Sequence, residues 1–306
     1  MPKRGPAAGR KRIAALTSFV LLLSACGTGA GRPADERPRV VTTFTVIADM
    51  ARNVAGGLIA VDSITKPGAE VHEYEPTPSD LLTAAKADLV LDNGLGLERW
   101  FERFVQRSEA EHVTLTEGVA PIPISGSDAI NPHAWMSPRT ARHYVIAIRD
   151  AFVRLDPAHE AAFRAHAEAY LAELDAVDRS LRAELATIPE QHRALVTCEG
   201  AFSYLARDAG LREAYLWPVN SEQEGTPQQI KATTEFVRAN GVPTIFCEST
   251  VNDQAQRQVA EETGAELGPP LHVDSLSGPD GPVPTYLDLL RHDARVIVEG
   301  LRGGAR

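Results

Sequence analysis

Short apolar segments rich in β-branched residues alternate along this chain with segments whose apolar residues recur every three to four positions. The first kind predicts buried strands, here at 39–47, 58–65, 87–91, 193–197, 212–216 and 244–247. The second kind predicts helices, here at 48–56, 78–86, 97–107, 201–209, 227–239, 253–263 and 286–301. This alternation predicts an α/β fold in which parallel β-sheets are flanked by helices.

A longer helical segment separates two such groups of strands and helices. It follows Asp156 and Pro157, an N-cap residue and a first-turn proline, and it ends before Pro189. Its apolar residues keep a helical spacing: Phe163, Tyr170, Leu171, Leu174, Val177, Leu181 and Leu185. About 31 residues make a helix of roughly 46 Å. We therefore expect an N-terminal α/β lobe over 39–155, a rigid linking helix over 156–188 and a C-terminal α/β lobe over 189–306.

The first 38 residues have the pattern of an export signal. Five basic residues precede an apolar run over 13–25, which as a helix spans about 20 Å, less than the roughly 30 Å of a bilayer core. Residues 1–25 therefore predict a signal peptide. Small residues before Cys26 resemble a bacterial lipobox, which implies cleavage there, lipidation of Cys26 and a lipid anchor on the extracytoplasmic face of the cell membrane. A simple secretory peptide is the alternative, and 26–38 is expected to be a flexible tether.

The net charge of the chain bears on which kinds of macromolecule it can bind. The whole chain has a net charge of −10, and without residues 1–25 it has 26 basic and 41 acidic residues, a net charge of −15. Such a chain is a poor nucleic-acid binder, because phosphate contacts need a basic face. We expect a monomer that binds no nucleic acid.

Two further cysteines, Cys198 and Cys247, fall at the ends of predicted strands in the C-terminal lobe. An even pair in an exported protein predicts a disulfide, provided that neighbouring strands bring the Cα atoms within about 7 Å. Two buried thiols are the alternative.

Four polar segments, 72–78, 131–138, 197–202 and 273–276, follow the predicted strands in loops. In parallel α/β sheets the carboxyl ends of the strands form the binding crevice. Two segments belong to each lobe, so we expect their side chains to meet where the lobes face each other.

The motifs HEYEPTPSD, NPHAWMSP, CEGAFSYLARDAGL, NSEQEGTPQQI and VDSLSGPDGPVPTYLDLLRHD together resemble the cluster 9 metal-binding receptors of bacterial ABC importers. The resemblance covers residues 39–301. It implies two α/β lobes joined by a long helix, with one transition metal between the lobes. Carried over by motif, the metal ligands are His72, His133, Glu199 and Asp274.

The ligand set favours manganese. Two imidazoles and two carboxylates make a mixed nitrogen and oxygen site, and carboxylates suit harder ions such as Mn²⁺. Zinc receptors of this family usually have a His at the third position and a His-rich loop after the first ligand. Here the third position is Glu199, and 73–132 holds a single histidine, His112. By ligand type iron is the next candidate, and a zinc receptor of the same family is the alternative function, because zinc binds such sites more tightly by intrinsic order.

Nearby polar residues leave other assignments open. Glu73 and Glu75 compete with His72 as ligands, and His272 could support Asp274 although a structural role is favoured. Two acids, Glu222 and Glu224, are expected at the rim of the site in solvent.

The resemblance implies a receptor that delivers Mn²⁺ to a permease and an ATPase, and not an enzyme. A metallohydrolase is disfavoured because four protein ligands leave little room for the water that a catalytic metal binds. No repeats or stalk support an adhesin.

Overall fold

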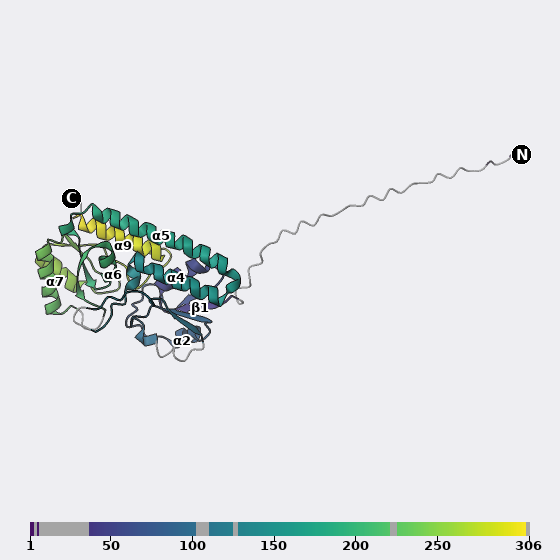
Figure 1. Ribbon diagram of the computed structural model, residues 1–306, viewed down its shortest axis with the longest axis horizontal. Helices are drawn as coiled ribbons and strands as arrows, with labels where there is room; N and C mark the ends of the chain where they lie inside the picture. The colour runs from purple at the N-terminus through teal and green to yellow at the C-terminus, as the bar shows by residue number, and fades with distance from the viewer. Residues whose placement is uncertain (3–4, 6–36, 102–109, 125–127, 221–224, 304–306) are drawn as a thin grey trace.

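The protein is described here as a computed structural model that covers residues 1–2, 5, 37–101, 110–124, 128–220 and 225–303 (Figure 1). Most of the predicted signal peptide, the predicted lipidation site Cys26 and nearly all of the predicted tether lie outside these ranges. Within these ranges, no helix combines the length and the apolar character that crossing a membrane requires.

The N-terminal half contains a parallel four-stranded sheet in the order β2-β1-β3-β4. Val41 of β1 lies opposite Asp62 on one side and Val90 on the other, so β1 is a central strand. The strands are β1 (Arg39–Thr42), β2 (Ala60–Ser63), β3 (Leu89–Asp92) and β4 (Glu111–Thr114).

The first strand is shorter than its β-branched sequence predicts. It ends at Thr42, and helix α1 (Thr45–Ala55) already begins within the predicted strand. Val46 and Ile47 share a buried helical face with Met50 and Val54, which explains why helical packing overrides their β-propensity. The helix ends at Gly56, whose φ of 56° is left-handed.

Helix α4 (Pro138–Leu155) was not among the predicted helices. The sequence carries its start signal, because the Ser137 hydroxyl accepts a hydrogen bond from the backbone of Arg139 and Pro138 opens the first turn. With α5 (Glu160–Ala186) it forms a helical hairpin beside the first sheet (Figure 1). The short helix α2 (Pro78–Ala84) lies at the edge of the same half.

The predicted linking helix is α5. It begins at Glu160 because Pro157–His159 forms a 3-10 turn, in which the His159 ring contacts the Asp156 carboxylate at 2.7 Å. One face is buried at helical spacing and packs on α1 and α4 of the first half and on α6 and α9 of the second. The buried residues are Phe163, Ala167, Tyr170, Leu174, Val177, Leu181 and Leu185.

The C-terminal half repeats the strand arrangement of the first. Its parallel pairs β5-β6 and β7-β8 are joined where the backbone N–H of Phe246 donates to the carbonyl of Val196 at 2.8 Å. The resulting order β6-β5-β7-β8 matches β2-β1-β3-β4. In each half the second strand is added on one side of the first, and the third and fourth strands are added on the other side. The order of the strands therefore reverses between β1 and β3 and between β5 and β7. Ligand sites form at such points. The strands are β5 (Ala194–Glu199), β6 (Arg212–Trp217), β7 (Thr244–Ile245) and β8 (Glu266–Leu267).

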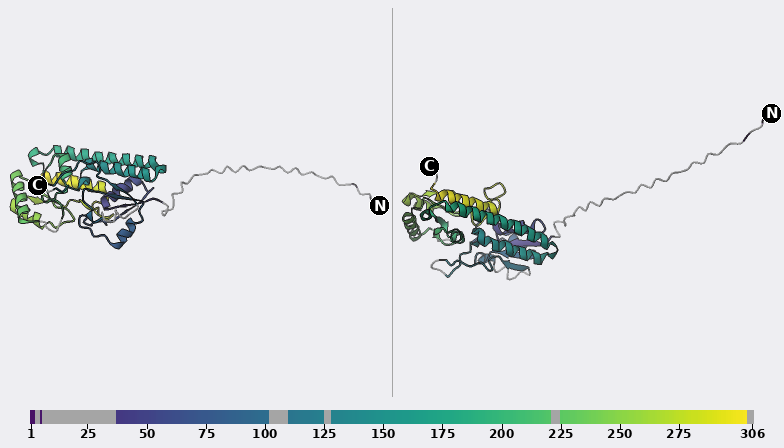
Figure 2. Two further views of the ribbon diagram at one scale, coloured as in Figure 1. Left: turned by 60° about the horizontal axis from the view of Figure 1, so that its bottom comes forward. Right: turned by 45° about the horizontal axis from the view of Figure 1, so that its top comes forward.

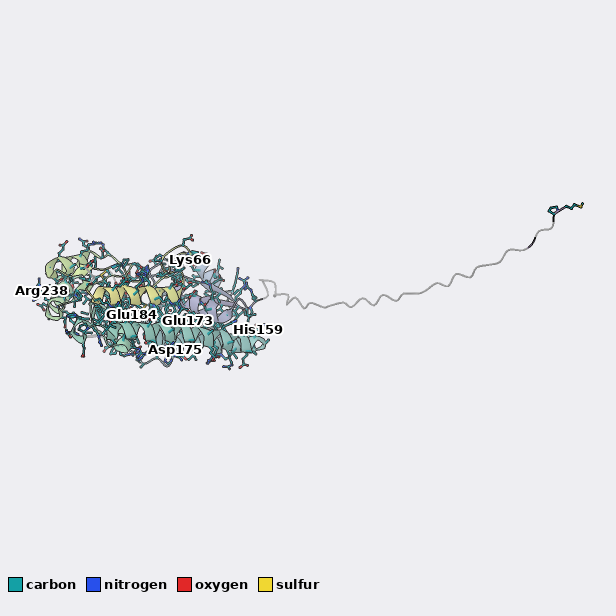
Figure 3. The ribbon with its side chains drawn as sticks, turned by 90° about the horizontal axis from the view of Figure 1, so that it is seen from above. Lys66, His159, Glu173, Asp175, Glu184 and Arg238 are labelled. Carbon is teal, nitrogen blue, oxygen red and sulfur yellow. A yellow bond between two sulfur atoms is a disulfide. The ribbon has the colours of Figure 1, made fainter. Side chains whose placement is uncertain are left out.

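Among the described residues four α-helices complete this half, and the last of them packs against the linking helix. Helix α9 lies beside α5 in all ribbon views (Figure 2). Exposed ion pairs join α9 and Arg302, just beyond its end, to α5: Arg291 with Glu173 at 2.6 Å and Arg302 with Glu184 at 3.7 Å. Figure 3 labels the two glutamates along α5. The helices are α6 (Ser203–Ala209), α7 (Pro227–Asn240), α8 (Gln254–Thr263) and α9 (Tyr286–Leu301).

One hydrophobic core joins the two halves. It contains residues of the first sheet such as Val40, residues of α5 such as Leu174 and residues of α9 such as Leu301. Because this apolar surface is shared, opening the molecule by a large hinge motion would expose it to water, which is costly. The long helix and the shared core therefore hold the halves in one arrangement around the site.

Candidate metal centre

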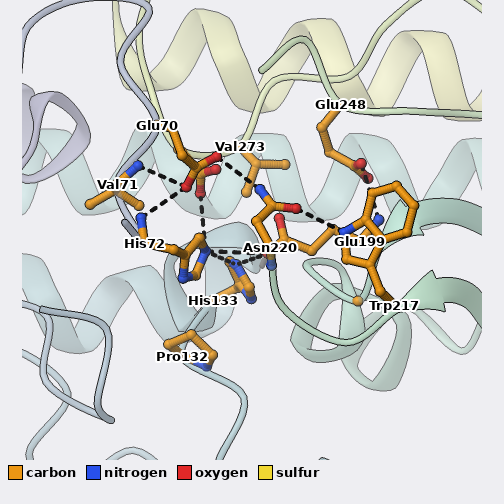
Figure 4. A network of polar contacts seen from close by, with 12 residues as sticks. Glu70, Val71, His72, Pro132, His133, Glu199, Trp217, Asn220, Glu248 and Val273 are labelled. Atoms are coloured by element: carbon orange, nitrogen blue, oxygen red, sulfur yellow. Dashed lines mark hydrogen bonds and ion pairs between the residues drawn. The ribbon is translucent and has the colours of Figure 1, made fainter. Parts of the chain in front are cut away.

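Four side chains from the two halves converge on one point. Figure 4 labels three of them, His72, His133 and Glu199. The Nε2 atom of His72 lies 3.0 Å from Nε2 of His133, 3.2 Å from Oε1 of Glu199 and 3.8 Å from Oδ1 of Asp274. One potential ligand atom from each of the four residues lies within 4.8 Å of the others. Sequence reasoning predicted this convergence, and the described structure contains it.

The four residues reach the centre from different local structures. Glu199 is the last residue of β5, and Asp274 follows Leu271, which pairs with Glu248 next to β7. His72 lies in a turn nine residues beyond β2, and His133 directly precedes the 3-10 turn Ala134–Met136. As expected for segments at or after strand ends, Glu199 ends a strand, whereas loops supply Asp274 and both histidines.

Asn131 orients the His133 ring. Its Oδ1 atom lies 2.9 Å from Nδ1 of His133, while its Nδ2 donates to the carbonyl of Gly200 at 2.6 Å. Because Nδ2 is the donor to Gly200, Oδ1 is the acceptor, which places the ring proton on Nδ1. The lone pair of Nε2 then points into the centre, in the form in which imidazole binds a metal.

Glu70 holds the His72 turn. One carboxylate oxygen, Oε1, accepts hydrogen bonds from the backbone N–H groups of Val71 and His72, both at 2.8 Å. The carbonyl of Val71 in turn accepts a bond from the indole of Trp100 at 2.9 Å. These contacts fix the backbone from which the His72 ring projects.

Glu199 is fixed at both its backbone and its side chain. Its N–H donates to Oε2 of Glu248 at 3.1 Å, and its Oε1 accepts a bond from the N–H of Asn220 at 2.8 Å. Among the described residues, no donor bonds to Oε2 of Glu199 or to either oxygen of Asp274. Buried carboxylate oxygens without donors are costly, and a divalent cation would satisfy them.

The predicted disulfide is present. Cys198 and Cys247 are bonded, with their Cα atoms 4.8 Å apart. The bond joins the end of β5 to the segment after β7. In the sequence each cysteine is followed by a glutamate, Cys198 by Glu199 and Cys247 by Glu248. It therefore fastens together two neighbouring carboxylates at the centre.

Burial and mutual charge set the protonation of the ligands. Burial tends to raise the pKa of Glu199, but the rings of His133 and His72 outweigh it and hold that pKa well below its usual range. Burial lowers the pKa of His133, which keeps this ring neutral. Burial also acts to lower the pKa of His72, yet the Glu199 charge raises it overall. For Asp274, burial and then the charge of Glu199 raise the pKa well above its usual range.

Of the four candidate ligands, His72 lines an open cavity of about 630 Å³. His72 and Asn220 line it together with Leu95, Ile130 and Pro132. The His72 side chain is 6% exposed, whereas those of the other three ligand candidates are fully buried. An ion from solvent therefore meets His72 first.

The other sequence candidates lie apart from the cluster. Glu73 and Glu75 are exposed and do not belong to it. The His272 ring contacts the hydroxyl of Ser249 at 3.1 Å instead of a ligand. Glu222 and Glu224 lie outside the described residues.

Sequence reasoning missed four residues that support the ligands: Glu70, Asn131, Asn220 and Glu248. Three of them carried a usable signal. Glu70 and Asn131 each stand two residues before a predicted histidine ligand. For Asn220 the signal was its place at the start of the motif NSEQEGTPQQI, and Glu248 carried none, because its contact depends on the folded chain.

The fold and the centre define a class, the metal-binding receptors of ABC importers. Over residues 40–300 the sequence matches the family described as zinc-uptake complex component A, periplasmic, and the chain belongs to this family of non-enzymatic, extracytoplasmic solute-binding proteins. Its role is thus that of the metal-binding component of an ABC transporter, which implies permease and ATPase partners.

Individual relatives differ in the metal that they are named for. The chain is 48% identical over 291 residues to the iron-binding protein YfeA of Yersinia pestis, covering 93% of this chain and 94% of that protein. It is 34% identical over 288 residues to the manganese-binding lipoprotein MntA of Halalkalibacterium halodurans, with 92% and 96% coverage. The structure of a Mn-bound periplasmic metal binding protein from Candidatus Liberibacter asiaticus is 37% identical, with a TM-score of 0.83, and the match covers 87% of this chain and all of that one.

Proposed function

We propose that this receptor captures Mn²⁺ as its transported substrate through His72, His133, Glu199 and Asp274. It then releases the ion to the permease of its transporter. A lipid on Cys26 holds the folded protein, a monomer, at the extracytoplasmic face of the membrane.

The observation that carries this proposal is the convergence of two imidazole nitrogens and two carboxylates within 4.8 Å at a buried point. Two carboxylates neutralise the charge of a divalent cation, and four protein ligands suit capture more than catalysis. Oε2 of Glu199 and both oxygens of Asp274 accept no hydrogen bond from the described residues, and a divalent cation would bind such oxygens.

Manganese is favoured by the donor atoms. Glu199 gives the site a second hard oxygen ligand where zinc receptors of the family usually place a histidine. The Mn-bound relative of known structure and the manganese-binding lipoprotein agree with this choice.

Iron is the second candidate, because the 48% identical relative is named for binding iron. Fe²⁺ stands next to Mn²⁺ in the order of intrinsic affinities, so the same donor set suits both ions. Metal supply in the native compartment then decides between them.

The test is the metal content of protein purified from its native envelope, measured by plasma mass spectrometry. Native purification matters because recombinant overexpression can load the wrong ion. About one Mn²⁺ per chain in the wild type and none in a variant with Asp274→Ala would support the proposal. Iron in place of manganese would favour the second candidate, and equal metal in both proteins would contradict the site.

The anchor is tested separately with Cys26→Ser. The wild type is expected to partition into the detergent phase and the variant into the aqueous phase, because a lipid adds membrane affinity with every buried methylene. Equal partitioning of the two proteins would contradict lipidation at Cys26.

A further inference from the structure

A hydrogen bond between the halves lies beside the metal centre. Oε2 of Glu70 accepts it from Nδ2 of Asn220 at 2.9 Å, and the two residues are 150 positions apart in the chain (Figure 4). The other oxygen of Glu70 holds the backbone of His72, as described above. The carboxylate therefore connects a ligand of the N-terminal half to a residue of the C-terminal half.

Asn220 is itself tied to a ligand of its own half. Its backbone N–H donates to Oε1 of Glu199, and its side-chain Oδ1 accepts a bond from the indole of Trp217 at 2.9 Å. The residue is 6% exposed, so its side chain has little freedom to turn away. Two residues thus link the backbone of His72 to the carboxylate of Glu199.

Two other contacts between the halves lie deeper, whereas some, such as the bond from the N–H of Gly68 to the hydroxyl of Ser275 at 2.7 Å, are also partly buried. The indole of Trp135 donates to the carbonyl of Val273 at 3.0 Å, and the N–H of Leu276 donates to the hydroxyl of Thr45 at 2.9 Å. Both are buried, and they hold the loop that carries Asp274. By contrast, the Glu70–Asn220 bond is only partly buried, and Asn220 and His72 both line the cavity that leads to solvent.

We propose that Glu70 and Asn220 are positioning residues that form a clasp beside the centre and set the rate at which the bound metal leaves. This inference rests on the proposed metal site. With the clasp formed, the His72 ring is held 3.2 Å from Glu199. With it broken, the partly exposed His72 turn withdraws and opens the coordination shell, while the buried ligands His133 and Glu199 stay in place.

A reciprocal exchange tests the clasp. Glu70→Gln places an amide donor against the donor of Asn220, and Asn220→Asp places a carboxylate against the carboxylate of Glu70. Combining them restores one donor facing one acceptor and keeps the net charge of the wild type. The introduced amide still accepts bonds from Val71 and His72, and the introduced carboxylate still accepts one from Trp217.

The readout is Mn²⁺ release into excess chelator, followed by stopped-flow tryptophan fluorescence on the full chain. Each single variant should release Mn²⁺ about 10–100-fold faster than the wild type, because residues that orient metal ligands typically carry effects of this size. The double variant should return to within about threefold of the wild type. Glu70→Asp, which keeps the charge but shortens the side chain, should also release faster.

The direction in which Asn220→Asp changes the release rate distinguishes a loss of positioning from the effect of an added negative charge. An added negative charge near a cation slows release if charge alone acts, whereas a broken clasp speeds it. Glu117→Gln removes one exposed charge in the same half and should keep the wild-type rate. The melting temperature of each metal-free variant reports whether it has folded.

Single variants that release at the wild-type rate or slower would overturn the clasp, as would a double variant as fast as the singles. In either case the proposed function still stands if the wild type binds Mn²⁺ and the Asp274→Ala variant does not. A wild type that binds no Mn²⁺ overturns both proposals.

Discussion

Glu199 and His72 face the same centre from opposite halves, but different kinds of structure hold them. Glu199 ends a fully buried strand, follows a disulfide-bonded cysteine and has its backbone bonded to Glu248. His72 lies in a loop turn whose main support is the partly buried carboxylate of Glu70. The strand end is fixed by covalent and backbone contacts, whereas the turn depends on a few polar contacts near solvent.

This difference indicates a division of labour. A ligand held in advance lowers the cost of ordering the site when the metal arrives, whereas a ligand on an adjustable turn lets the ion enter and leave. The shared core and the long helix resist a large hinge motion, so a local movement of the His72 turn is the less costly route to the centre. The following predictions test the two sides separately.

The largest expected effect is the loss of a fixed ligand. At 1,000 times the dissociation constant, a ligand bound only by the folded state adds about 4 kcal/mol of stability. We expect Mn²⁺ to raise the melting temperature of the wild type accordingly and to leave that of His133→Ala unchanged. Metal-free melting of the variant controls for the cavity left by the ring. A similar metal-dependent shift in both proteins would show that His133 is not a ligand.

Removing the disulfide between Cys198 and Cys247 tests whether the fixed position of Glu199 contributes to metal binding. The bond closes a loop of 49 residues, and chain entropy assigns such a loop about 4 kcal/mol of stability. The double variant Cys198→Ser and Cys247→Ser should lose about this free energy of unfolding in urea and should bind Mn²⁺ more weakly, while the N-terminal half stays folded. The variant also separates loss of the bond from chelation by a reductant. Unchanged Mn²⁺ affinity would mean that the bond does not position Glu199.

Low pH should weaken Mn²⁺ binding through ligands of both halves. The raised pKa values of His72 and Asp274 mean that these groups hold protons more readily than usual in the metal-free protein, and Mn²⁺ must displace those protons. Affinity should therefore rise with pH and fall from pH 7 to 5, by about tenfold per pH unit for each displaced proton. Calorimetry in buffers of different ionisation enthalpy counts the protons. No proton release in this range would contradict the assigned ligands.

A smaller effect is expected from exchanging the ligand type at the fixed position. Glu199→His replaces a hard oxygen by an imidazole, so the preference should shift towards Zn²⁺ by about tenfold, or 1.4 kcal/mol. Competitive titration of Mn²⁺ against Zn²⁺ measures the ratio on both proteins. The same ratio in both would place Glu199 outside the coordination shell.

Much of the fold could be predicted from local pattern. The terminal helix 286–301 was predicted with its observed bounds, since its apolar face is regular. Strand β1 was predicted too long because Thr45, Val46 and Ile47 are β-branched residues in a helix. Helix α4 was missed although Ser137 and Pro138 mark its start.

The candidate ligands could be predicted because each lies in a motif of the family. The contacts by which supporting residues hold them across the fold could not, for a physical reason. The partners of Glu70 and Glu248 lie 150 and 49 positions away, and a polar residue in a loop looks the same in sequence whether it is solvated or bonded across the fold. Only the folded arrangement distinguishes a supporting carboxylate such as Glu70 from an exposed one such as Glu73.

The central claim is that one divalent ion binds between the halves at these four residues. Anomalous diffraction at the manganese edge, from crystals grown with Mn²⁺, tests it most directly. The account predicts one strong peak within about 2.6 Å of Nε2 of His72, Nε2 of His133 and the carboxylate oxygens of Glu199 and Asp274. A peak bound by other residues, or one that lacks two or more of these four ligands, would contradict it.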